Sequence, residues 1–142
     1  MEKIKEFQNQ YRFLSNYWPV KITYEGLIYL SSEAAFQAAK TLDMEKRKEF
    51  TTMVPGTSKK AGRFLDLRDD WEYIKRKIMY DIVKIKFTEN QELKGLLLDT
   101  YPLELEEGNK WNDTYWGVCD GKGSNVLGFI LMLIRAELMI EN

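Results

Sequence analysis

The sequence contains no histidine and only one cysteine among its 142 residues. The absence of histidine excludes Ser-His and Cys-His nucleophilic systems and metal sites built on imidazole. A single cysteine excludes an internal disulfide framework and a cysteine-rich zinc site. Any catalysis must therefore come from carboxylates, amines, guanidinium groups, tyrosines or backbone groups, and we expect no metal and no cofactor.

The chain also has little net charge and no long apolar run. Its longest apolar stretch, residues 126–134, is too short to cross a bilayer, and its first residues form no apolar segment typical of a signal peptide. The formal net charge of −1 argues against general attraction to nucleic acid or to a membrane, although a local basic cleft is compatible with it. We expect a cytoplasmic protein with no membrane partner and no obligate protein partner.

The composition is that of one globular domain. Hydrophobic residues make up 44% of the chain and charged residues 30%, and the length is sufficient for a hydrophobic core. Because there is no linker, repeat or low-complexity tract, we predict a single domain over residues 1–142.

The stretch from Ser31 to Lys40 predicts a helix with an unusual polar stripe. Ser31 is a typical N-cap, and Glu33, Gln37 and Lys40 fall on one narrow line of a helix. Phe36 and four alanines cover most of the remaining surface. One interpretation is an internal helix whose polar groups face a cavity. The other, held equally, is a partly exposed helix with Glu33 at its positive end and Lys40 in solvent.

Hydrophobic periodicity and turn residues predict the other elements. Residues 20–24 and 27–30 form a hairpin through Glu25-Gly26. The expected helices cover 44–53, a segment from Thr57 or Ser58 to 64, a segment from Asp69 or Asp70 to 87, 91–99 and 126–139. The long helix has a core stripe formed by Trp71, Ile74, Ile78, Ile82 and Ile85. The predicted fold class is α+β, mainly α-helical, with a small N-terminal β-hairpin.

Residues 106–125 form a long polar segment with four glycines and two tryptophans. A loop of this length in a compact domain is usually functional or disordered, and the aromatic residues argue against disorder. Asn125 is expected to cap the apolar helix that follows. Arg135 interrupts that helix and requires a carboxylate or carbonyl partner; we favour a structural ion pair over a ligand contact.

Several motifs in a fixed order resemble the NADAR family, also called YbiA-like N-glycosidases. They extend over residues 13–138 and include Phe13-x-Ser15-Asn16-Tyr17, Tyr24-x-Gly26, Ser32-Glu33-x-x-Phe36-Gln37-Ala38-x-Lys40, Lys59-x-x-Gly62-Arg63, Arg68-x-x-Trp71, Lys86-Phe87-x-x-Asn90, Asp113-x-x-Trp116-Gly117 and Gly123-x-Asn125-x-Leu127-Gly128. The sequence departs from the family in two places: Ala34 stands where many relatives have histidine, and the loop residues Val118-Cys119-Asp120 differ locally.

The resemblance implies a YbiA-like fold and hydrolysis of the N-glycosidic bond between a ribose and a base. Two substrate classes follow from it. One is the ribosylamino-pyrimidine phosphates of riboflavin synthesis, and the other is ADP-ribose attached to guanine in nucleic acid. The expected partners are therefore a small ribosylated base with phosphate and ADP-ribosylated nucleic acid.

In both substrates C1′ of ribose is joined to an amine-like nitrogen, which can open to an imine. Lys40 is our candidate nucleophile, because a desolvated lysine attacks such a carbon to form a Schiff base. Glu33 would move protons to the departing nitrogen and then activate water, while Gln37 orients a ribose hydroxyl. The alternative mechanism divides acid and base roles between Glu33 and Asp113.

Substrate binding is assigned to residues that match family positions or lie beside them, namely Asn16, Gln37, Lys59, Lys60, Arg63, Arg68, Trp116, Gly117 and Asn125. Arg63 and Arg68, with Lys59 or Lys60, supply donors for phosphate. Trp116 would stack on the base. The alternatives are solvated surface charges, and a tryptophan that anchors its loop in the core.

Three functional classes are compatible with these residues. An N-ribosyl hydrolase is favoured, because simple binding requires neither Glu33 nor Lys40. A non-catalytic binder of ADP-ribose or related nucleotides is the second class, and a structural or inhibitory protein is the third. Release of free base from a ribosylated substrate distinguishes the first class from the other two.

Overall fold

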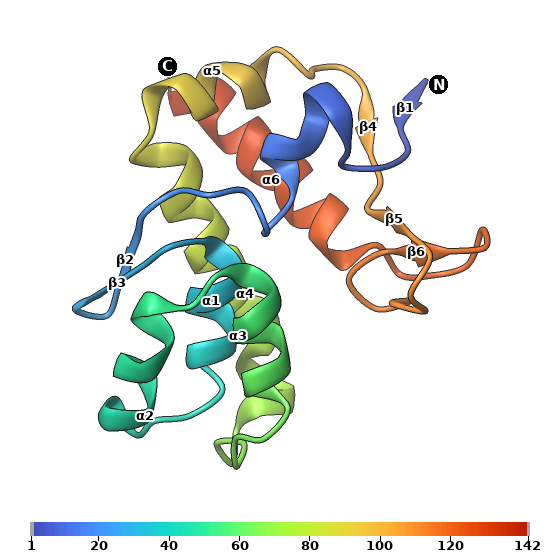
Figure 1. Cartoon of the computed structure of the whole chain (residues 1–142). Coiled ribbons are helices and arrows are strands. Elements are labelled where there is room, and N and C mark those ends of the chain that lie inside the picture. Colours follow the sequence, from blue (N-terminus) through green and yellow to red (C-terminus); the bar gives the residue numbers. More distant parts are fainter. Residues whose placement is uncertain (1, 142) are drawn as a thin grey trace. The chain divides into compact units, whose positions relative to one another are not determined.

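A computed structural model describes residues 2–141 of the chain, which form two compact units. One unit comprises residues 16–86, and the other comprises the described residues before 16 and after 86 (Figure 1). The single domain expected over residues 1–142 stays a prediction, and residues 1 and 142 lie outside the described range.

In the unit of residues 16–86, a hairpin leads the chain into a short helix. Strand β2 (Ile22–Tyr24) pairs antiparallel with β3 (Leu27–Tyr29), as the sequence predicts. Glu25 and Gly26 form the turn with φ values of 46° and 88°. A positive φ has no steric cost for the glycine. The chain then enters α1 (Ser32–Ala38).

Helix α1 is the centre of this unit, because all of its residues are buried. Helix α3 (Pro55–Gly62) packs against it. The ring of Phe36 also lies 5.1 Å from that of Trp71, measured between centroids. Of the two interpretations of this segment, the internal helix is therefore confirmed.

The next two helices differ from the expected boundaries. Residues 44–53 divide into α2 (Met44–Glu49) and a 3₁₀ turn, η2 (Phe50–Thr52). Helix α3 begins at Pro55, so the expected cap at Thr57 or Ser58 is wrong. Proline fits the first turn of a helix because its fixed φ suits the helix and its missing N–H is not needed there.

Helix α4 (Trp71–Thr88) starts directly after Asp70, close to the predicted position. Ile74 N–H donates to the carbonyl of Asp70 (3.0 Å). Trp71, Ile78 and Ile82 of the predicted core stripe are buried. The expected core face of this helix is confirmed, and its remaining isoleucines are only partly buried.

The other unit combines helices with short paired strands (Figure 1). β1 (Lys3–Ile4) lies parallel to β4 (Glu104–Leu105), and β5 (Gly108–Asn109) lies parallel to β6 (Val118–Cys119). Its helices are η1 (Asn9–Leu14), α5 (Gln91–Leu98) and α6 (Val126–Glu141). The mainly helical α+β class is confirmed, and residues 106–125 contain regular structure that the sequence did not predict.

Helix α6 supplies much of the core of this unit through Leu127, Ile130, Leu131, Ile134 and Leu138. The buried Arg135 donates to Thr100 Oγ1 (2.9 Å) and to the carbonyl of Leu103 (2.8 Å). A carbonyl partner is thus confirmed, whereas the ion pair that we favoured is wrong: within residues 2–141 the partners of Arg135 are a hydroxyl and a carbonyl. Within residues 2–141 there is no helix whose length and apolar character would suit a bilayer crossing.

Candidate active site

The backbone at Glu33 is fixed by the first turn of α1. Ser31 Oγ accepts a hydrogen bond from Ala34 N–H (3.1 Å), which confirms the predicted N-cap. The carbonyl of Asn16 accepts from Glu33 N–H (3.1 Å), and its Oδ1 accepts from Ser32 Oγ (2.8 Å). Asn16 therefore positions the residue that carries the carboxylate. Its predicted contact with substrate stays a prediction.

Glu33 and Gln37 lie one helical turn apart and are bonded to each other. Gln37 Nε2 donates to Glu33 Oε2 at 2.7 Å, the length of a charge-assisted hydrogen bond. Their exposed fractions are 9% and 6%, so both side chains are sheltered from bulk water. The i, i+4 pairing follows directly from helix geometry.

Lys40 lies beyond the helix and not on it. Helix α1 ends at Ala38, Ala39 is its C-cap, and Lys40 follows in a turn where its N–H donates to the carbonyl of Gln37 (3.2 Å). The predicted continuation of the helix to residue 40 is therefore wrong. Lys40 nevertheless stays close enough to Glu33 for the carboxylate charge to act on its amine.

The surroundings of Lys40 favour its neutral amine. Burial lowers the pKa of Lys40, and the positive charges of Arg63 and Lys59 lower it further, while Glu33 acts in the opposite direction. The neutral amine is the form of lysine that attacks carbon, and a lowered pKa increases its share. The fold thus brings Glu33, Gln37, Lys40, Lys59 and Arg63 of the predicted set into one electrostatic cluster.

The predicted phosphate-binding residues have different environments. Arg63 is exposed and follows α3 as its C-cap residue, and Lys60 is also exposed. The guanidinium of Arg68, in contrast, holds Asp70 through Nε (2.6 Å) and Nη2 (3.2 Å).

Arg68 also supports the turn that carries Lys40. Its N–H donates to the carbonyl of Lys40 (2.8 Å), and its Nη1 donates to the carbonyl of Ala39 (3.4 Å). Since the guanidinium is engaged with Asp70 and Ala39, the contacts of Arg68 are those of a structural residue. Its predicted role in phosphate binding stays a prediction.

Tyr17 is a residue of this cluster that sequence reasoning did not select. Burial raises the pKa of its hydroxyl, the Glu33 carboxylate raises it further, and Arg63 lowers it. The residue as a whole is 44% exposed. The signal was present in the sequence, because Tyr17 follows Asn16 in one of the motifs.

Asp113 and Trp116 belong to the other unit. Asp113 Oδ1 accepts hydrogen bonds from the backbone N–H groups of Trp116 (2.9 Å) and Tyr115 (3.2 Å). The half-buried Trp116 ring meets the ring of Tyr115 edge-on, with centroids 4.8 Å apart. These contacts order the loop, and neither the acid–base role of Asp113 nor the stacking role of Trp116 is tested by them.

Gly117 and Asn125 also hold the loop together. A Cβ at Gly117 would overlap Glu107, so only glycine fits there. Asn125 is buried; its Oδ1 accepts from Glu107 N–H (2.9 Å) and its Nδ2 donates to the carbonyl of Leu105 (2.9 Å). The side chain thus links the loop to the strand before it. Substrate binding by Gly117 and Asn125 stays a prediction.

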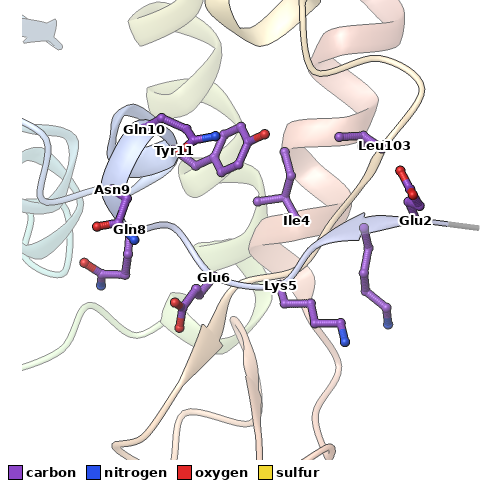
Figure 2. A pocket seen from close by; sticks show the side chains of 10 residues that line it. Glu2, Ile4, Lys5, Glu6, Gln8, Asn9, Gln10, Tyr11 and Leu103 are labelled. Atoms are coloured by element: carbon purple, nitrogen blue, oxygen red, sulfur yellow. The ribbon is translucent and has the colours of Figure 1, made fainter.

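The same unit contains an open hollow of about 750 Å³ between its N-terminal strand and η1 (Figure 2). Ile4, Tyr11 and Leu103 supply apolar surface to it, and charged and amide side chains supply the rest. None of the predicted site residues lines this hollow. In the described part of the chain, no three acidic or cysteine side chains gather as a metal site would require.

The comparisons with known proteins agree on one family. A family model described as "NADAR domain" matches residues 3–139. N-glycosidase YbiA of Escherichia coli (strain K12) is 39% identical over 139 residues, which cover 94% of this chain and 85% of the relative. The NMR structure of E. coli YbiA has a TM-score of 0.87 at 36% identity, over 99% of this chain and 88% of that one. The YbiA-like fold is thereby confirmed.

A longer relative combines a similar region with further sequence. A riboflavin biosynthesis protein of Vibrio vulnificus is 39% identical over 132 residues. The match covers 89% of this chain but only 35% of that protein. The present chain therefore corresponds to one part of that relative.

Proposed function

The chain belongs to the NADAR family, and on that premise we propose that it is a hydrolase that breaks the N-glycosidic bond between a ribose and an amino-linked base. The observation that carries the proposal is a sheltered carboxylate, Glu33, whose charge acts on an amine of lowered pKa, Lys40. Binding alone requires neither group. The arrangement therefore favours hydrolysis over a non-catalytic module for ADP-ribose.

The names of two relatives favour a ribosylamino-pyrimidine phosphate as substrate. The E. coli relative is named an N-glycosidase, and the Vibrio relative is named for riboflavin biosynthesis. ADP-ribose on guanine is the second substrate class that we propose to test. Arg63 and Lys59 would donate to the phosphate of either substrate. A cytoplasmic location and the lack of an obligate protein partner stay predictions.

The proposed reaction begins with a proton transfer from the ammonium of Lys40 to Glu33. The bond between C1′ and the ring oxygen of ribose then breaks, the oxygen takes the proton from Glu33, and C1′ becomes doubly bonded to the base nitrogen. The neutral amine of Lys40 adds to C1′ and returns a proton to Glu33. Both nitrogens are now bonded to C1′.

Departure of the base leaves a Schiff base on Lys40. Glu33 protonates the base nitrogen, and the electron pair of its bond to C1′ stays on that nitrogen. The carboxylate next takes a proton from water, whose hydroxide adds to C1′. When the bond to Lys40 breaks, the amine regains its proton and the ribose closes its ring. The sum of the steps consumes one water and releases base and sugar.

The mechanism with two carboxylates has less support. It requires Asp113 to act with Glu33 across the ribose. One oxygen of Asp113 already accepts two backbone N–H groups of its own loop. These bonds give Asp113 a part in ordering its own loop. Lys40 is the better supported partner of Glu33.

The test is release of free base by the purified protein. We would incubate it separately with a ribosylamino-pyrimidine phosphate and with ADP-ribosyl-guanosine, and measure base and sugar phosphate by mass spectrometry. We expect turnover of at least one substrate by the wild type and not by Glu33→Gln. Tight binding of both compounds without release of base would contradict the proposal and favour a binding module.

A further inference from the structure

Gly62, the last residue of α3, lies directly against the side chain of Gln37. A Cβ built at Gly62 would overlap Gln37 Oε1 and would come within 2.9 Å of its Cδ. The backbone of Gly62 is not in the left-handed region, so its conformation does not require glycine. Glycine is also a poor helix former. Space for Gln37 is therefore the physical reason for a glycine at this position.

This contact decides how the amide of Gln37 is held. Its Nε2 donates to Glu33 Oε2 at 2.7 Å. Its Oε1 is buried and has no hydrogen-bond partner within residues 2–141. No bond at Oε1 therefore fixes the amide, and Oε1 occupies the space that a side chain at residue 62 would fill.

We propose that Gly62 is a positioning residue of the site: its missing side chain is what allows Gln37 to orient the Glu33 carboxylate. This inference rests on the proposed function, in which Glu33 transfers protons. A methyl group at residue 62 would displace the Gln37 amide, and Glu33 would lose the donor that fixes one of its oxygens. Small displacements of a reacting group reduce turnover strongly.

The chain offers a matched control in the same helix. A Cβ at Gly56 would meet no atom within 4 Å outside its own helix and chain neighbours. Gly56→Ala and Gly62→Ala therefore introduce the same methyl group in α3, but only the second reaches Gln37. We expect kcat to fall about 10–100-fold in Gly62→Ala with KM changed less than about threefold, and both to stay near wild type in Gly56→Ala.

A double-variant cycle shows whether the effect passes through Gln37. In a Gln37→Ala background the overlap is gone, so Gly62→Ala should cause no further loss of kcat. A second measurement does not depend on activity. The side-chain amide signals of Gln37, assigned with Gln37→Ala, should shift in the NMR spectrum of Gly62→Ala and not in that of Gly56→Ala.

Two results would overturn the inference. One is a folded Gly62→Ala whose kcat and Gln37 amide signals match those of Gly56→Ala. The other is an equal loss of kcat with and without Gln37. If Gly62→Ala alone does not fold, the added Gln37→Ala change should restore folding, and failure to do so also refutes the contact. An inactive wild type would instead refute the proposed function, while the amide signals would still test the contact.

Discussion

Glu33→Gln is the substitution that most directly tests the proposed chemistry. It removes the proton-transfer group and keeps the size of the side chain. The backbone bond from Glu33 to Asn16 and the N-cap at Ser31 do not involve the replaced atoms. A glutamine at residue 33 also retains a carbonyl oxygen that can accept from Gln37 Nε2. We therefore expect the fold to be preserved.

The expected loss of activity is large compared with the change in stability. General acid–base catalysis contributes about 100–10,000-fold, or about 3–5 kcal/mol of transition-state stabilisation. In the folded state one charge-assisted bond becomes a neutral one, which costs about 1 kcal/mol, and removal of a buried charge offsets part of that cost. The prediction is a fall in kcat of about 100-fold or more with a small change in the free energy of unfolding.

The protonation of Lys40 does not explain such a loss. The Glu33 carboxylate raises the pKa of Lys40, so its removal lowers that pKa and increases the neutral amine. A slower Glu33→Gln variant would therefore report the missing proton transfer.

The assay is steady-state release of base, with urea unfolding of the same samples. Glu72→Gln is a suitable control, because Glu72 is an exposed carboxylate that pairs with Lys75 on the surface of α4. A folded Glu33→Gln protein whose kcat stays within about threefold of the control would remove Glu33 from the mechanism.

Four further predictions follow from other residues. Borohydride added during turnover should leave a sugar-phosphate or ADP-ribosyl mass on the peptide that contains Lys40, and Lys40→Ala should abolish both turnover and adduct; an active wild type without an adduct would favour the two-carboxylate mechanism. Arg63→Lys should weaken the binding of phosphorylated ligands by about 1–3 kcal/mol in titrations and leave the binding of unphosphorylated ligands unchanged. Arg68→Lys loses the two-pronged contact with Asp70 and should therefore affect the binding of both kinds of ligand alike. Burial lowers the pKa of Lys86 to about 7 from 10.5, so the unfolded chain binds more protons than the folded one between these pH values. The free energy of unfolding should therefore rise with pH in this range. An unchanged slope in Lys86→Met would contradict this assignment. Exhaustive treatment with a chelator should leave base release unchanged, and loss that one divalent ion restores would show a metal requirement.

The sequence predicted the features that depend on neighbouring residues. Ser31 caps its helix because a serine hydroxyl reaches the N–H groups of the next turn. Glu33 and Gln37 meet because residues four apart share a helix face. The Glu25-Gly26 turn similarly fixes the hairpin register. In each case the spacing along the chain determines the contact.

Helix ends were predicted less well, because competing local signals were close in strength. The expected helices over 44–53 and from Thr57 or Ser58 left Pro55 between them, whereas α3 begins at Pro55. The helix that carries Glu33 ends at Ala38, and Lys40 remains near Glu33 through a turn. Neither the capping pattern nor the alanine-rich composition distinguishes a final helical turn from the looser turn that follows it.

Only the tertiary structure decided which charged side chains surround the amine of Lys40 and which form ion pairs that stabilise the fold. Arg68 and Asp70 pair with each other, whereas Arg63 acts on Lys40, although both arginines lie in one short basic segment. Tyr17 lies near Glu33 despite the hairpin between them in the sequence. Such contacts depend on how α3 and the N-terminal segment pack against α1, and packing across distant segments has no fixed spacing in the sequence from which it could be predicted.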